Sequence, residues 1–167
     1  LLAHQWHIRN TGASAFSTVL PAAGNDMNVA GAWAAGYSGR GVKVAVVDSG
    51  LEIAHEDLAA NVDAANSFNF LTGTTDPTLD AGVVGSDHGT MVAGIIGAVA
   101  FNGKGGRGVA YNARLRGYNY LKSGQTVTNY RDATGGKNSA DNAIFNQSFG
   151  VNAAKLWAEL APHGIRV

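Results

Sequence analysis

The chain of 167 residues has no cysteine, only three prolines, and 12 basic residues balanced by 12 acidic ones. Without cysteine it can form no disulfide bond, thiolate zinc site or cysteine nucleophile. The zero net charge lacks the positive excess typical of proteins that bind nucleic acid or anionic membranes. No apolar run approaches the roughly 18 residues of a membrane span, and the first residues lack a signal-peptide pattern. We therefore expect a mature or trimmed chain with no nucleic-acid partner and no membrane span.

The composition that remains is typical of one globular domain. Apolar residues make up 46% of the chain and charged residues 14%, which is enough apolar surface for a core and too little charge for disorder. The 23 glycines favour a compact fold with many tight turns.

Strand-like and helix-like segments alternate along the chain. The run Val42–Val47 is almost entirely β-branched, as expected of a strand buried on both faces. Helices are predicted at 27–35, with Asp26 as the N-cap candidate before it and Gly36 after it, and at 88–100 and 153–160. Further strands are predicted at 114–121, 143–148 and 165–167, and a loop at 72–77. This alternation predicts an α/β fold, a three-layer open parallel sheet with helices on both faces. Because the last residues resemble the beginning of a strand, we expect the domain to be incomplete in this chain.

Two polar residues stand where chemistry is expected in such a sheet. Asp48 ends the strand Val42–Val47, and functional groups collect at the carboxyl ends of parallel strands. His88 precedes Gly-Thr at the start of an apolar helix. An acid followed by a histidine is the chain order of one lineage of Asp-His-Ser hydrolases. Taken singly, Asp48 before Ser-Gly fits a turn former better than a catalytic acid, and His88 could be a capping or packing residue.

The neighbours of these residues resemble the subtilisin-like serine proteases, and most closely their kexin-like branch. The similarity extends over nearly the whole chain, in the order Gln5-Trp6, Asn28-Val29, Ala32-Trp33, Gly36–Gly39, Val46–Gly50, His55–Asp57, His88–Thr90, Ala93-Gly94, Gly108–Ala113 and Ser148–Gly150. So many matches in one order are highly specific. The resemblance implies a secreted or cell-surface serine endopeptidase of bacterial origin that acts on polypeptides.

The same resemblance implies the catalytic roles. Asp48 would orient the imidazole of His88, which would accept the proton of an attacking serine hydroxyl. The family's Gly-Thr-Ser and its oxyanion asparagine are not in this sequence. We therefore expect the serine on a missing carboxyl-terminal portion, which would also be the chain's partner. The 167 residues alone should be inactive.

The resemblance also implies where the substrate binds. Ser148, Phe149 and Gly150 match an edge segment whose backbone pairs with an extended substrate. Leu121 would line a nearby subsite, or it is an ordinary core residue. Kexin-like enzymes carry an acid directly after the catalytic aspartate to recognise paired basic residues, and this chain has Ser49 there. We therefore do not expect dibasic specificity.

A structural calcium site is the last implication. Asp57 matches an acidic ligand, and the glycine-rich segment after the predicted helix matches the loop that supplies the remaining oxygens. Such oxygens are the ligands that calcium prefers. The alternative interpretation of this loop is a helix cap and turn. The expected ligands are Asp57, Val99, Asn102, Lys104 and Gly106.

A different class of function fits the same residues. The chain could belong to a pseudoprotease or interaction module that keeps the fold and the peptide-binding groove without catalysis. Retention of both Asp48 and His88 favours the protease.

Overall fold

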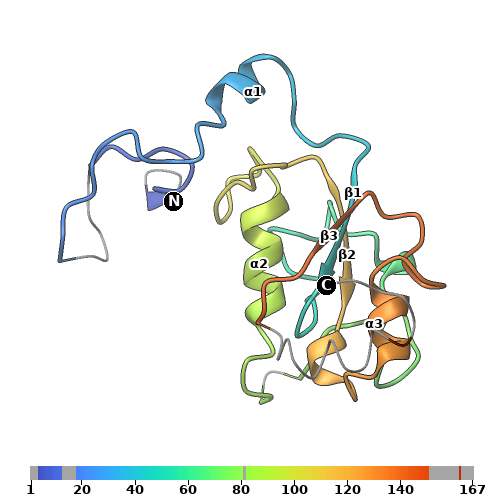
Figure 1. Cartoon of the computed structure of the whole chain (residues 1–167). Coiled ribbons are helices and arrows are strands. Elements are labelled where there is room, and N and C mark those ends of the chain that lie inside the picture. The colour runs from blue at the N-terminus through green and yellow to red at the C-terminus, as the bar shows by residue number, and fades with distance from the viewer. Residues whose placement is uncertain (1–3, 13–17, 81, 151–161, 163–167) are drawn as a thin grey trace.

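The computed structural model describes residues 4–12, 18–80, 82–150 and 162. Their strands β1 (Lys43–Val47), β2 (Arg114–Tyr118) and β3 (Ile144–Asn146) form a parallel sheet with the order β2-β1-β3. The helices are α1 (Ala30–Ala34), α2 (His88–Gly97) and α3 (Val127–Ala133), with short 3-10 helices at Ala64–Asn66 and Tyr120–Lys122. Figure 1 shows α2 and α3 on opposite sides of the sheet.

Strand β1 lies at the centre and supplies both cores, because successive side chains of a strand point to opposite faces. Val44 and Val46 belong to the core beneath α2, together with Leu115 and Ala93. Ala45 and Val47 belong to the core on the other face, which includes Tyr118 of β2 and Ala133 of α3. The predicted three-layer fold with a parallel sheet and helices on both faces is therefore confirmed.

The predicted strand 42–47 and helix 88–100 both form, with altered ends. Helix α2 ends at Gly97 rather than at residue 100, because Ala98 turns to an extended conformation (φ −55°, ψ 142°). The N–H of Val99 then donates to the carbonyl of Asp57 (2.8 Å) instead of continuing the helix. The predicted strand 114–121 ends at Tyr118 and is followed by a 3-10 turn, and the predicted strand 143–148 is reduced to β3.

The first helix, α1, is shorter than the predicted 27–35. Asp26 does not cap α1; its carboxylate accepts hydrogen bonds from the backbone N–H groups of Asn10 and Asn28 (both 2.8 Å). The end of α1 follows the prediction, because Gly36 adopts a left-handed conformation (φ +87°). The N–H groups of Gly36 and Tyr37 bond back to the last turn of the helix, which is the usual glycine-terminated helix end.

Helix α3 lies in a region for which the sequence predicts no element. Its beginning is capped by Thr126, whose hydroxyl accepts a hydrogen bond from the N–H of Asn129 (3.1 Å). The predicted loop at 72–77 lies in a region of turns and bends. The predicted helix 153–160 and strand 165–167 lie outside the described residues.

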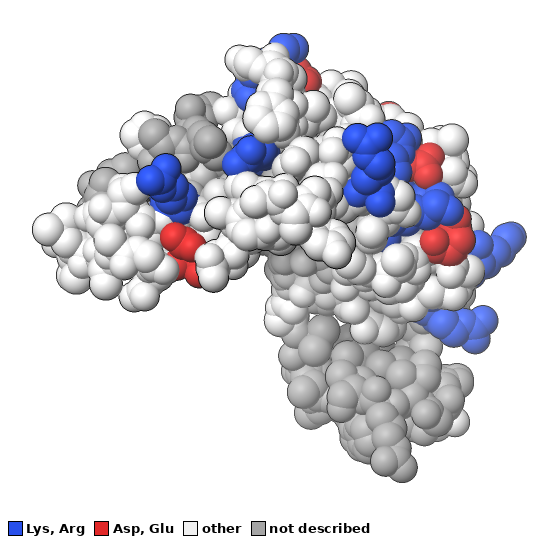
Figure 2. Space-filling model, turned by 90° about the horizontal axis from the view of Figure 1, so that it is seen from above, with Lys and Arg blue, Asp and Glu red and all other residues white. Residues whose placement is uncertain are grey.

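The amino-terminal segment is attached to the body by polar and aromatic contacts. The side chain of Gln5 both donates to and accepts from the backbone of Arg107 (each 2.9 Å). The guanidinium of Arg107 stacks over the ring of Trp33, 3.7 Å from its centroid. Figure 1 shows this segment and α1 beside the sheet rather than within its layers. In Figure 2, basic side chains on the visible face are dispersed, with acidic ones among them.

Candidate active site

The site expected from the sequence lies at the carboxyl end of β1. Asp48 directly follows the strand, and His88 is the first residue of α2. Nδ1 of His88 lies 2.7 Å from Oδ1 of Asp48. The side chain of Asp48 is fully buried, whereas 45% of the His88 side chain is exposed. The structure therefore brings together the two residues to which the sequence assigns acid and base roles.

Backbone contacts hold Asp48 in place. Its N–H donates to the carbonyl of Tyr118 and its carbonyl accepts from the N–H of Leu121, both at 3.0 Å. Oδ1 also accepts from the N–H of Ser49 at 2.6 Å. Oδ2 is buried and has no hydrogen-bond partner among the described residues. The carboxylate can thus serve only as an acceptor that faces the imidazole.

Of the two ring nitrogens of His88, one contacts Asp48 and the other is available for a further hydrogen bond. Opposite an ionised carboxylate, which only accepts, Nδ1 would carry the proton and Nε2 would be the basic nitrogen. Within the described part of the chain, Nε2 makes no hydrogen bond. The ring is accessible from solvent, because 45% of the His88 side chain is exposed.

Two glycines allow α2 to approach the turn after β1. Gly50 has a positive φ of +145°, and a β-carbon there would lie 2.4 Å from the carbonyl oxygen of Pro77. A β-carbon on Gly89 would lie 2.1 Å from the carbonyl oxygen of Gly50 and 3.0 Å from Cβ of Asp48. Backbone therefore packs directly on backbone at both glycines, and a larger residue at Gly89 would push the start of α2 away from the turn that carries Asp48.

The expected substrate-binding residues lie partly together. Leu121 and Phe149 pack against the same core, that of Val47 and Tyr118. The ring of Phe149 is 6.0 Å from that of Tyr120. Ser148 and Gly150 are exposed, and the hydroxyl of Ser148 accepts from the side-chain amide of Asn146 (2.9 Å). Leu121 packs against this core, as its second interpretation expects, and its N–H donates to the backbone carbonyl of Asp48; its role in a subsite stays a prediction.

The residues expected to bind calcium are gathered around Asp57. Its carboxylate is buried and accepts from the side chain of Asn102 (2.7 Å) and from the N–H of Gly106 (3.1 Å). A β-carbon on Gly105 would lie 2.0 Å from Oδ2 of Asp57, so the loop fits closely around the acid. No donor among the described residues binds the carbonyl oxygens of Val99, Lys104 or Gly106.

Asp57 is the one acid among the expected ligands, and Asn102 faces it with its amide nitrogen, while the amide oxygen of Asn102 accepts from the N–H of Lys104 (3.0 Å). The residues that the structure describes contain no group of three or more histidine, cysteine, aspartate or glutamate side chains placed to hold a metal. Backbone carbonyls and an amide oxygen would have to supply the remaining ligands, as they commonly do for calcium. The ε-ammonium of Lys104 lies 3.1 Å from Glu56, away from this set.

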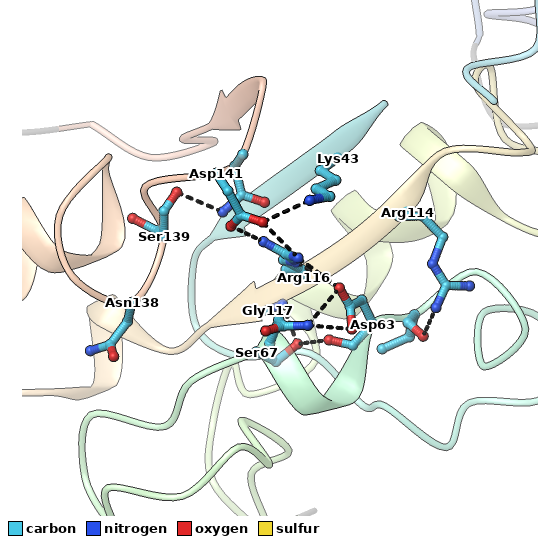
Figure 3. Close-up of polar contacts among 12 residues, drawn as sticks. Lys43, Asp63, Ser67, Arg114, Arg116, Gly117, Asn138, Ser139 and Asp141 are labelled. Atoms are coloured by element: carbon cyan, nitrogen blue, oxygen red, sulfur yellow. Dashed lines mark hydrogen bonds and ion pairs between the residues drawn. The ribbon is translucent and has the colours of Figure 1, made fainter. Parts of the chain in front are cut away.

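A second group of charges lies toward the amino ends of the strands. Asp48 lies at the opposite, carboxyl end. Figure 3 shows the buried guanidinium of Arg116 between the carboxylates of Asp63 and Asp141, with Lys43 also on Asp141. Burial opposes the charge on Asp63, but hydrogen bonds from Asn66 and Arg116 lower the pKa of its carboxyl group. Hydrogen bonds from Arg116 and Lys43 hold the pKa of Asp141 far below its ordinary value. This network joins β1, β2 and the segment before β3.

A parallel α/β sheet with an aspartate and a histidine paired at its carboxyl end is the arrangement of a subtilisin-type hydrolase. The chain belongs to the subtilase family, whose model matches residues 39–161. It is 46% identical over 152 residues to the extracellular serine protease of Aeromonas sobria, covering 89% of this chain and 24% of that protein. It is 43% identical over 122 residues to furin-like protease 2 of Drosophila melanogaster, covering 72% and 7%.

Solved structures agree with these matches. The crystal structure of the Aeromonas sobria serine protease superposes with a TM-score of 0.80 at 45% identity, over 89% of this chain and 25% of that one. The same protease in complex with its chaperone gives a TM-score of 0.81 at 40% identity, over 97% and 29%. The chain thus spans about a quarter of the length of the Aeromonas protease. The family predicted from the sequence, including its similarity to furin-like enzymes, is confirmed.

Proposed function

We propose that this chain supplies the acid and base of a serine endopeptidase, with Asp48 and His88 in an Asp-His-Ser triad. The 2.7 Å contact between Oδ1 of Asp48 and Nδ1 of His88 carries the proposal. Membership in the subtilase family supports it. The class of enzyme is a hydrolase that cleaves peptide bonds.

The contact defines what each residue would do. Asp48 holds the proton on Nδ1, so that the lone pair of Nε2 points away from the acid and toward solvent. Nε2 then takes the proton of a serine hydroxyl as its oxygen bonds to the peptide carbonyl carbon, and Asp48 stabilises the imidazolium that forms. When the C–N bond breaks, the same proton passes to the departing amine. A water molecule repeats the sequence and releases the acyl group.

The nucleophile in this proposal is a serine outside these 167 residues. Ser49 is buried and its hydroxyl is bonded to backbone groups, and the Ser148 hydroxyl is bonded to Asn146. The sequence contains no Gly-Thr-Ser. The chain alone would then be inactive, and its working partner would be the complementary carboxyl-terminal polypeptide of the same protease. The substrates would be polypeptides, bound along Ser148–Gly150 and near Leu121.

Calcium is part of the same proposal, in a structural role. Asp57 would hold the ion with Asn102 and the backbone carbonyls of Val99, Lys104 and Gly106. The ion would neutralise the buried carboxylate and fix the loop that follows α2. The close fit of Gly105 around Asp57 supports the proposal, because it leaves the carboxylate at the centre of the loop.

Secretion is the location we propose. The relative from Aeromonas sobria is named as an extracellular protease. No helix in the described parts of the chain is both long and apolar enough to cross a bilayer. The chaperone complex of that relative makes a dedicated folding partner a reasonable candidate here.

A serine-directed phosphonate separates the protease from the non-catalytic alternative. We expect covalent labelling of the purified active protein, detected by intact mass, and loss of labelling in the His88→Ala variant, because the serine then has no base. Folding of the variant is checked by circular dichroism. A folded native protein that takes up no label and cleaves no peptide would identify a binding module instead.

A further inference from the structure

The hydroxyl of Ser49 bridges the two backbone segments that flank His88. Its oxygen accepts a hydrogen bond from the N–H of Gly89 (3.0 Å), directly after the histidine. The same hydroxyl donates to the carbonyl of Ser86 (3.2 Å), two residues before it. A single side chain thus holds the chain on both sides of the expected base.

The backbone of Ser49 contacts the acid as well. Its N–H donates to Oδ1 of Asp48 (2.6 Å), which is the oxygen that faces Nδ1 of His88. Ser49 is 2% exposed, so little water is present to replace these bonds if they are lost. Leaving a buried group without its partner is destabilising, which keeps the arrangement rigid.

We infer that Ser49 is a positioning residue that fixes the imidazole of His88 against Asp48, an inference that rests on the proposed function. Its peptide N–H holds the acid, and its hydroxyl holds the backbone that carries the base. A displacement of about 1 Å within a catalytic pair commonly costs a factor of 100 in rate. Because Ser49 is buried and its hydroxyl already donates and accepts within the protein, it does not serve as a contact for the substrate.

Ser67, the residue that follows the 3-10 helix Ala64–Asn66, provides a matched control. It is also 2% exposed. Its hydroxyl accepts from the N–H of Gly117 (3.0 Å) and donates to the carbonyl of Asp63 (3.1 Å). Figure 3 shows Ser67 beside Asp63 and Gly117, in the charged network rather than at the Asp48–His88 pair. The two serines therefore make the same kind of bridge, and only that of Ser49 holds the histidine.

The experiment compares Ser49→Ala with Ser67→Ala in the purified protein. The readouts are the melting temperature, kcat and KM for a peptide substrate, and the proton resonance of the Nδ1–H of His88 by NMR. We expect both variants to melt at similarly reduced temperatures. Ser49→Ala should lower kcat by about 10- to 100-fold with a smaller change in KM, and should shift or broaden the Nδ1–H resonance. Ser67→Ala should change neither.

Equal effects of the two variants on kcat and on the resonance would overturn the inference, because Ser49 would then be only a stabilising residue. If Ser49→Ala does not fold, Ser49→Cys enters the same comparison, since it keeps the volume and weakens both hydrogen bonds. The NMR readout needs no catalytic activity. A changed resonance in a protein that neither cleaves peptide nor takes up phosphonate would reject the proposed function and leave the positioning role of Ser49 supported.

Discussion

The backbone of Gly89 lies directly against the carbonyl of Gly50, which is why a β-carbon on Gly89 would stand 2.1 Å from that oxygen. The first turn of α2 is thereby seated on the turn that follows β1. The hydrogen bond between His88 and Asp48 depends on this contact between two glycines.

Gly89→Ala should therefore be destabilising, although alanine is the better helix former. The added methyl must push α2 away from backbone atoms that cannot rotate aside, which costs about 1–3 kcal/mol in a packed interior. Gly94→Ala is the matched control, since it lies in the same helix and a β-carbon there meets nothing within 4 Å. It should be neutral or stabilise by up to about 1 kcal/mol. Urea denaturation of both variants provides the measurement, and equal stabilities would contradict the described contact.

Asp48→Asn tests the orienting role of the acid. The amide can present an N–H to Nδ1 and so favour the wrong tautomer of His88, and the imidazolium loses its counter-charge. We expect kcat to fall by about 10⁴-fold, as for the equivalent change in other serine proteases, with little change in KM. Steady-state kinetics on the active protein measure this. A loss below tenfold would mean that Asp48 has another role.

Gly105→Ala tests the loop around Asp57. Its β-carbon would lie 2.0 Å from Oδ2 of Asp57, whereas at Gly103, in the same loop and also at positive φ, a β-carbon would meet nothing within 4 Å. Both alanine variants incur the backbone strain of positive φ, so their difference isolates the contact with the carboxylate. We expect a larger stability loss in Gly105→Ala.

Calcium binding provides a second measurement on the variants Gly105→Ala and Gly103→Ala. An ion that binds only the folded protein raises the melting temperature in a concentration-dependent way. We expect added calcium to stabilise the native protein and Gly103→Ala, and to stabilise Gly105→Ala less. If chelation leaves the melting temperature of the native protein unchanged, the calcium proposal is wrong.

Acid should weaken the protein through Asp63 and Asp141. The pKa of each is lower in the folded state than its ordinary value of 3.8, despite the desolvation that opposes this at Asp63. The unfolded chain therefore binds more protons, and the stabilisation present above pH 3.8 is lost as the pH falls further. Asp141→Asn should lower stability at neutral pH and reduce the additional loss below pH 4. Urea midpoints at several pH values measure this.

The control for this prediction is Asp80→Asn. Asp80 is exposed and makes no ion pair with any described residue. Its substitution should leave the acid dependence as it is in the native protein. If both substitutions change the dependence equally, the network around Arg116 does not account for it.

The parts of the fold that follow from local pattern were predictable. The β-branched run predicted β1 to within one residue. The glycine after the predicted first helix, Gly36, marked the end of α1. The pairing of Asp48 with His88 was expected from their neighbours, although their catalytic roles remain predictions. The buried bridge of Ser49 was not foreseen, because its partners lie 37 and 40 residues away and a serine after an acid is an ordinary turn residue.

Two further features depend on long-range contacts that a sequence pattern does not show. In the sequence, Arg116 is one basic residue among several. Only the pairing of β2 with β1 places it between Asp63 and Asp141. Helix α3 has little apolar periodicity, so its single local signal is the cap formed by Thr126. Its position is decided by Ala133, which fills the core on the second face of the sheet.

Strand β1 contributes alternate residues to two separate cores and carries Asp48 immediately after its last residue. A slip of one position would exchange Val44 and Val46 with Ala45 and Val47 between the two faces, and would also carry the acid about 3.3 Å along the strand. In this segment, the register that packs both cores tightly is therefore also the register that aligns Asp48 for catalysis. Conservative volume changes at these four positions should reduce turnover in proteins that still melt cooperatively. Inherited substitutions there would then be selected against through lost activity before they are selected against through lost folding.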